Sequence, residues 1–243
     1  MTVNVNAAYP LFFEIFTSRM HQGGILQRLK KPSRRRADIM YNPPQFVLQD
    51  FPQILQLISA QPLALLIGPD AAGKSFVTHV PLTAQQDEQG WLLEGHMAQA
   101  NPHWQWLSAQ SEVLAVFNGP SAYVSPQHYE HERNVPTWNY LAVHVYGDLE
   151  LVQEAEAKDA LLKRLIAQHD PGYAAQWRGL PSDYQGRMLS AIVGFRLRVT
   201  RCEAKAKLSQ NRSAVERASI QAQYREGSGN ERELALWMER LGL

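Results

Sequence analysis

Two β-prone runs on either side of a tight turn constrain the fold of this chain most. The first, Leu63 to Ile67, is apolar, and the second, Ser75 to Leu82, is rich in β-branched residues and places Phe76, Thr78, Val80 and Leu82 at alternate positions. The turn between them has Pro69 and Asp70 early and Gly73 late, which is favourable turn chemistry. The pattern predicts a β-hairpin, and therefore an antiparallel sheet.

The same turn fits the phosphate-binding loop pattern G-x-x-x-x-G-K-[ST] at every fixed position from Gly68 to Ser75. A working loop of this type requires a helix directly after it, because the first backbone N–H groups of that helix hold the phosphates. Here β-branched Val77 and Val80 follow, and Pro81 stands close behind them, so a strand is favoured over a helix. We expect a hairpin tip and not a nucleotide triphosphate site.

The remaining patterns predict a protein that is mainly β with flanking helices (α+β). Asp50 and Pro52 start a helix that ends near Pro62, and Gln85 to Gly90 is predicted to be a polar loop. Further strands are predicted at 91–97, 112–118, 121–124, 139–152 and 191–207, and further helices at 101–109, 154–169, 214–227 and 230–241. The strands follow one another through short turns or single helices, which favours a closed or half-closed antiparallel barrel over a parallel sheet.

Charge is distributed unevenly along the 243 residues. Residues 1–39 hold 7 of the 24 Lys/Arg and 2 of the 23 Asp/Glu, which leaves 17 basic against 21 acidic groups in residues 40–243. A net acidic surface disfavours generic binding to a phosphate backbone. The run Lys30-Lys31-Pro32-Ser33-Arg34-Arg35-Arg36 is compatible with a nucleic-acid arm, but also with a solvated extension or with read-through upstream of a start at Met40. We expect residues 1–39 to be a basic extension outside the core.

The cysteine content indicates the redox compartment of the protein, and the length of its apolar runs shows whether a membrane span is expected. Cys202 is the sole cysteine in the sequence, so no internal disulfide forms and a reducing, cytoplasmic compartment is expected. The longest apolar runs, such as Leu63 to Ile67, have five residues, whereas a membrane span needs about 20. No membrane span is predicted.

Several ordered blocks carry a resemblance to a known family. They are Met40-Tyr41-Asn42-Pro43-Pro44, Thr78-His79-Val80-Pro81-Leu82, Gly95-His96-Met97-Ala98-Gln99-Ala100-Asn101-Pro102-His103-Trp104, Phe117 to Pro126, Val135 to Tyr140, and Lys207 to Arg212. With these blocks the chain resembles the PaiB family, which is described as FMN-binding negative transcriptional regulators. The resemblance runs in order from about Met40 to about Arg225.

The resemblance implies a fold and an assembly. It implies a six-stranded antiparallel Greek-key split β-barrel of the FMN-binding type over residues 40–225, with inserted helices. The sequence pattern itself predicts a C-terminal helix at 226–243. The resemblance also implies a homodimer with the flavin at the subunit interface. Possible DNA contact has no identified surface, since no helix-turn-helix is visible in the sequence.

An FMN site needs a grip on the phosphate, an apolar shelf for the ring and donors near its carbonyls and nitrogens. By the resemblance, one strand along the flavin contributes Thr78, His79, Val80 and Pro81, and an anion site forms at His96, Met97, Gln99 and Asn101. Trp138 and Asn139 would cover the ring, and Ser209, Gln210 and Arg212 would come from the second subunit. Trp138 could instead fill the core, Asn101 could cap a helix, and His79 and His96 could be structural histidines.

One position departs from the family pattern. A basic residue often stands where this chain has Gln99, so the phosphate needs another cation, for which Lys205, Lys207 and Arg212 are the candidates. Other constellations are weaker: His128 and His131 lack a third metal ligand at suitable spacing.

Arg196, Arg198 and Arg201 on the last strand could face a phosphate or nucleic acid, or form a solvated face or the rim of an interface.

Three functions are consistent with the sequence. The first is a homodimeric, FMN-binding negative transcriptional regulator of the PaiB type. The alternative is an FMN-dependent oxidoreductase of the split-barrel class, for which the sequence offers no recognisable acid/base or nicotinamide site. The second alternative, kept open by the neutral Gln99, is a cofactor-free sensor or structural dimer.

Overall fold

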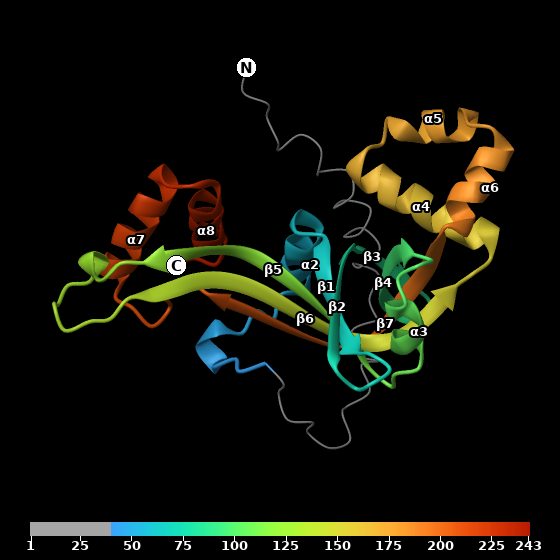
Figure 1. Cartoon of the computed structure of the whole chain (residues 1–243). Coiled ribbons are helices and arrows are strands. Elements are labelled where there is room, and N and C mark those ends of the chain that lie inside the picture. Colours follow the sequence, from blue (N-terminus) through green and yellow to red (C-terminus); the bar gives the residue numbers. More distant parts are fainter. Residues whose placement is uncertain (1–39) are drawn as a thin grey trace. The chain divides into compact units, whose positions relative to one another are not determined.

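Seven antiparallel strands form a single sheet in the order β2-β1-β5-β6-β7-β4-β3 (Figure 1). The computed structural model describes residues 40–243, so the predicted basic extension at 1–39 lies outside the described residues. The strands are β1 (Leu63–Pro69), β2 (Ser75–Pro81), β3 (Thr83–Asp87), β4 (Gly90–Ala98), β5 (Val113–Val124), β6 (Thr137–Val152) and β7 (Ile192–Lys207). The mainly β, α+β prediction is confirmed.

The hairpin between β1 and β2 replaces the phosphate loop that its sequence matches. The two strands pair from Leu63 opposite Pro81 to Pro69 opposite Ser75. Asp70 closes the tip, because its Oδ1 accepts hydrogen bonds from the backbone N–H groups of Ala72 and Lys74 at 2.8 Å each. Gly73 has φ 76°, a left-handed conformation that glycine adopts without strain. A strand and not a helix follows Lys74, as predicted.

The predicted count of six strands is not confirmed, because the segment read as a polar loop contains a seventh. Three residues of that loop, Gln85 to Asp87, belong to β3, which pairs with β4 around a turn that ends at Gly90. This edge strand is mostly polar and lacks the alternation of apolar and polar residues that predicts a strand, so the sequence pattern does not reveal it. Its backbone hydrogen bonds to β4 hold it in the sheet. Only Leu82 separates β3 from β2 in sequence, so the sheet curls until its two edges meet at that corner, although the sheet is not closed.

The strands β5, β6 and β7 are the longest in the sheet. The predicted short pieces at 112–118 and 121–124 are one strand, β5, whose pairing with β6 shifts register between Asn118 and Ser121. The β6–β7 ladder also shifts at Gly147, where a Cβ atom would collide with the backbone carbonyl of Arg198. Glycine is therefore required there, and the strand is irregular at this position.

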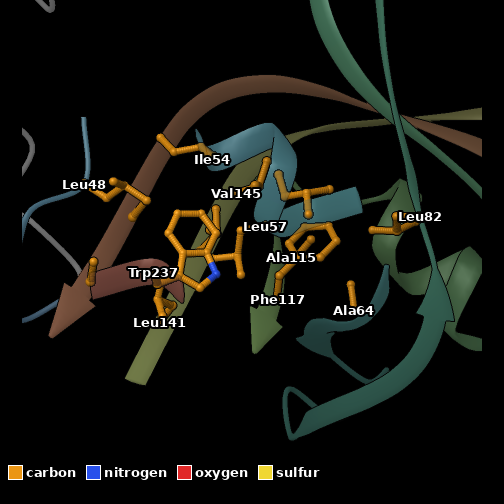
Figure 2. Close-up of a cluster of buried hydrophobic side chains, with 14 of the residues drawn as sticks. Leu48, Ile54, Leu57, Ala64, Leu82, Ala115, Phe117, Leu141, Val145 and Trp237 are labelled. Carbon is orange, nitrogen blue, oxygen red and sulfur yellow. The ribbon is translucent and has the colours of Figure 1, made fainter. Parts of the chain in front are cut away.

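The core lies on the side of the sheet that α2 (Phe51–Ala60) covers. Asp50 accepts a hydrogen bond from the backbone N–H of Gln53 and so caps α2 as predicted. Figure 2 shows Leu57 of α2 beside Phe117 of β5, and both side chains are fully buried. Three further short helices precede β6 in the described residues: the 3-10 helices Pro44–Phe46 and Pro126–His128, and α3 (His103–Ser108).

Helices α4 (Ala155–His169), α5 (Tyr173–Gly179) and α6 (Ser182–Ser190) lie between β6 and β7 in sequence, at one end of the sheet (Figure 1). One link between these helices and the sheet is a carboxylate, Glu94 of β4, which is 3% exposed and accepts hydrogen bonds from Arg164 of α4 and Arg196 of β7. The short helices α5 and α6 were not predicted, since they are brief, polar and separated by the helix-ending Leu180-Pro181.

At the other end of the sheet, α7 (Ala214–Glu226) and α8 (Gly229–Arg240) pack together (Figure 1). Each begins with a capping box, formed by Ser213 with Glu216 and by Ser228 with Glu231. Fully buried Trp237 of α8 joins the central core (Figure 2), so the C-terminal helix predicted at 226–243 is part of the same unit as the sheet. Within residues 40–243, no helix is long and apolar enough to cross a membrane.

Candidate functional site

A hydrogen-bond network joins β2 to the turn between β4 and α3. The Asn101 side chain donates to Thr78 Oγ1 at 3.2 Å and accepts from the backbone N–H of His103 at 3.0 Å. Thr78 Oγ1 also lies 2.8 Å from His103 Nδ1. Thr78 and Asn101, both predicted site residues, are therefore in direct contact, and Asn101 precedes Pro102, the N-cap residue of α3, which makes no side-chain capping bond.

His103 organises this corner, although its sequence block was noted without assigning it a role. The ring is fully buried, it lies 4.8 Å from the Phe76 ring between centroids, and burial lowers its pKa. A neutral imidazole is therefore favoured, and the Thr78 contact makes one ring nitrogen the hydrogen-bond partner of a hydroxyl. In the sequence, His103 is marked only by its place two residues after Asn101 in a turn. A surface histidine would show the same local pattern, so the sequence does not predict that His103 is buried.

The predicted flavin strand has two faces. The Val80 side chain is 2% exposed and belongs to the hydrophobic core, so it supports the strand from inside. His79 is exposed and stands opposite Leu65 of β1, and Pro81 stands opposite Leu63. Because directly opposed residues share a face of the sheet, His79 and Pro81 lie on one face with these two leucines.

The predicted anion segment likewise divides between core and surface. Met97 is 4% exposed and packs in the core, whereas Gln99 is exposed. The backbone of Gln99 is held on both sides: its N–H donates to Ala191 O at 2.8 Å, and its carbonyl accepts from Trp104 Nε1 at 3.2 Å. The Gln99 side chain therefore projects from a fixed point.

His96 lies on β4 between Glu94 and Ala98. Its Nδ1 is buried without a hydrogen-bond partner among residues 40–243, and burial lowers its pKa. A buried ring nitrogen that the protein leaves unpaired is available to a ligand donor or acceptor.

A groove of about 320 Å³ opens beside Gln99. Its lining consists of one aromatic, three aliphatic, two carboxamide and one ammonium side chain: Trp104, Val152, Ile192, Val193, Gln99, Gln153 and Lys158. The groove combines apolar walls with a few polar groups, which is the composition of small-ligand sites.

The other predicted site residues lie where β7 ends. Ser209 Oγ donates to Asn139 Oδ1 at 3.0 Å, and both residues are buried. Ser209 has φ 62°, the one positive φ among the non-glycine residues described, so this turn is conformationally strained. Gln210 accepts from the backbone N–H of Leu208 at 2.7 Å and donates to Ala206 O at 2.5 Å, which fixes the turn.

Trp138 is 55% exposed and makes an edge contact with Tyr123, at 6.1 Å between ring centroids. The alternative that Trp138 fills the core does not hold. Lys207 donates to Trp138 O at 2.8 Å and to Thr137 Oγ1, while burial and the neighbouring Lys205 lower the pKa of Lys207. Tyr123 and Trp138 thus form a pair of exposed aromatic rings at this end of the sheet, set at 76° to one another.

Lys205 and Arg212, which the sequence offered as cations for the phosphate in place of Gln99, also lie near the end of β7 and are bonded to other protein groups. Lys205, 6% exposed, donates to Tyr41 O at 2.9 Å. Arg212 donates to Asn134 Oδ1 at 2.7 Å and stacks 3.8 Å above the Tyr129 ring.

The three arginines of β7 do not form an open basic patch. Arg196 pairs with Glu94 at 3.0 Å, Arg198 with Asp87 at 2.7 Å, and Arg201 with Glu203 at 3.1 Å. No cluster of His, Cys, Asp or Glu suited to a metal ion occurs in residues 40–243, and His128 Nδ1 lies 3.1 Å from Ser219 Oγ instead.

The candidate residues therefore form two groups, one around Thr78, His96 and Gln99 and the other around Trp138 and Ser209. Their residues fit a flavin: the first group offers a carboxamide, an unpaired imidazole nitrogen and a groove, and the second offers aromatic rings and hydroxyls. When bound, FMN supplies hydride or electron transfer chemistry.

The family model described as "Putative FMN-binding domain" matches residues 40–201. The chain belongs to this FMN-binding family. A relative from Bacillus subtilis, the protease synthase and sporulation protein PAI 2, is 32% identical over 204 residues, which cover 82% of this chain and 97% of the relative. The resemblance to the PaiB family is confirmed, and FMN is the cofactor that the family match supports.

Solved structures share the fold at low sequence identity. The FAD and heme binding protein from Mycobacterium smegmatis has a TM-score of 0.55 at 16% identity, covering 71% of this chain and 78% of that one. The flavocytochrome Anf3 from Azotobacter vinelandii has a TM-score of 0.54 at 18% identity, covering 66% and 69%. At these identities the similarity shows a shared fold alone.

Proposed function

We propose that this protein is an FMN-binding homodimer of the PaiB type that acts as a negative transcriptional regulator. The curled sheet, whose edges meet at Leu82, is in this proposal the split barrel of the FMN-binding fold. The observation that carries the proposal is the division of the candidate residues into two groups at opposite ends of the long strands.

The separation follows from the register of β7. Gly194 stands opposite His96 of the first group, and Lys207 stands opposite Tyr140, the residue after Asn139 of the second. At about 3.3 Å per residue, the strand between them measures roughly 40 Å along its path, longer than a flavin mononucleotide. A two-fold related copy would bring the second group of one chain to the first group of the other.

One face of the sheet suits such a copy. Leu63, 61% exposed, and Val77, 46% exposed, lie on it together with Leu65 and Ile67, as the pairing of β1 with β2 requires. The same register continues this apolar strip onto Val116 of β5. His79 and Pro81 share the face, so a partner that covers the strip would also reach the predicted flavin strand.

A complementation experiment tests the shared site. Gln99→Glu places a negative charge in the first group, and Trp138→Ala removes the exposed ring from the second. Each variant alone should lose FMN binding, measured by quenching of flavin fluorescence, while remaining a dimer by light scattering. Co-expression of the two variants should restore up to half of the sites, because a mixed dimer carries one intact site. No restoration in a confirmed mixed dimer would contradict a site between subunits.

The regulatory part of the proposal needs a route to DNA. Residues 40–243 carry a net charge of −4, so phosphate contacts would have to come from the basic run at 30–36, outside the described residues. Promoter DNA should be retarded by the full chain in a salt-sensitive way, and reversal of Arg34, Arg35 and Arg36 to Glu should abolish the shift. Retardation that survives this reversal would exclude that route.

A further inference from the structure

The binding of a flavin phosphate by this chain raises a charge problem. A phosphate dianion is normally met by a cation, yet Gln99, in the segment predicted to hold the anion, is neutral. The cations considered from the sequence lie near the end of β7, in the second group. Lys205 and Lys207 stand opposite Ala142 and Tyr140 of β6, whereas Gln99 follows the strand that pairs with the beginning of β7. Within one chain, none of them faces the groove beside Gln99.

Lys158 of α4 does face that groove, which it lines together with Gln99. Its stem runs over Gly194 of β7, because a Cβ atom at Gly194 would lie 3.4 Å from Lys158 Cγ. Gly194 is the register partner of His96 on β4. The lysine thus crosses the sheet beside the histidine whose Nδ1 is buried and unpaired.

The ammonium group of Lys158 is held without being neutralised. It donates to Leu189 O at 2.6 Å and to Ile192 O at 3.3 Å, and both acceptors are backbone carbonyls. An ammonium has three N–H donors, so one is left over. Within residues 40–243 Lys158 makes no ion pair with a carboxylate, in contrast to Lys163 and Arg164 of the same helix, which pair with Asp159 and Glu94. A fixed, half-buried cation without a counter-ion is suited to an anionic ligand.

We propose that Lys158 supplies the positive charge that receives the phosphate of the bound flavin, in the groove that it shares with Gln99. The proposal rests on the proposed function, and it deepens it by assigning the phosphate end to the inserted helix α4. Two backbone carbonyls aim the ammonium, and the Gln99 carboxamide adds a neutral donor.

The ratio of FMN affinity to riboflavin affinity isolates this role, because riboflavin lacks the phosphate alone. Both flavins are titrated by fluorescence quenching against the full-length dimer. Lys158→Gln should weaken FMN binding roughly ten- to hundredfold, the range for a lost charge-assisted hydrogen bond, and change riboflavin binding less than about twofold. Lys163→Gln is the matched control, as it removes the same charge from an exposed position of the same helix and should leave the ratio unchanged.

Two further variants distinguish the effect of the Lys158 charge from a purely structural role of its side chain. Lys158→Arg keeps a cation and should retain most of the FMN preference. Gln99→Lys in the Lys158→Gln background should restore it, because the charge returns to the same groove from the strand. If Lys158→Gln is unfolded by circular dichroism, Gln99→Lys alone decides: it should raise the FMN-to-riboflavin ratio above that of the unaltered protein.

The outcomes that overturn the inference are distinct from failure of the proposed function. Equal losses for both flavins would mean that Lys158 only fastens α6 and β7 to α4. An unaltered protein that binds FMN no better than riboflavin, or a ratio unmoved by Lys158→Gln or by Gln99→Lys, would also overturn it. An unaltered protein that binds neither flavin would overturn the proposed function itself.

Discussion

Glu94→Gln should destabilise this protein more than any change to its exposed ion pairs. The carboxylate is 3% exposed and accepts from Arg164 at 2.6 and 2.9 Å and from Arg196 at 3.0 Å. Glutamine has nearly the same volume, so no cavity forms. Its amide nitrogen would instead point a donor at a guanidinium, which is also a donor.

The magnitude follows from burial. Breaking a fully buried ion pair costs about 3–5 kcal/mol, because the remaining charge stays unpaired in a poor solvent. The side chains of Arg164 and Arg196 are 37% and 35% exposed, so water screens part of this loss. We expect the free energy of unfolding to fall by about 2–3 kcal/mol.

Glu150→Gln on β6, which β7 separates from β4, is the matched control. Glu150 is 48% exposed and pairs with Arg198 at 3.1 Å, so its loss should cost less than about 1 kcal/mol. Both variants are compared by urea denaturation near pH 7, and hydrogen exchange should show faster opening of α4 in Glu94→Gln alone. The reasoning is refuted if Glu94→Gln costs no more than Glu150→Gln.

Four further outcomes are expected. Asn101→Ala should lower the free energy of unfolding by about 1–2 kcal/mol in urea, since it removes the hydrogen bonds to Thr78 Oγ1 and from the His103 N–H; an unchanged midpoint would contradict the network. Asp70→Ala should cost about 1 kcal/mol and Lys74→Ala less than about 0.5, and the unaltered protein should bind no ATP by calorimetry, as expected of a hairpin tip. Burial lowers the pKa of His144, so the unfolded state binds its proton first; the melting temperature should fall as pH drops below about 6.5, and less steeply in His144→Gln. Burial raises the pKa of the Cys202 thiol to about 12, so iodoacetamide should label it at pH 8 only after unfolding.

Local chemistry determined the elements that sequence reasoning placed well. β-branched Val77 and Val80 excluded the helix that a phosphate loop needs, and the hairpin of β1 and β2 follows from them. Asp50 set the start of α2 through a contact three residues away. Such interactions act within one or two turns of chain, so they can be read before the fold is known.

Tertiary structure decided the rest, because the deciding partners are distant in sequence. β3 is polar and exists through its ladder with β4, and His103 is buried only because β2 and α3 meet there. The neutral Gln99 predicts that another cation meets the phosphate, and Lys205, Lys207 and Arg212 are the candidates in the sequence. Docking of α4 on the sheet instead sets Lys158 beside Gln99. Periodicity describes which side of an element is apolar, but only the packing of one element on another decides which charges meet.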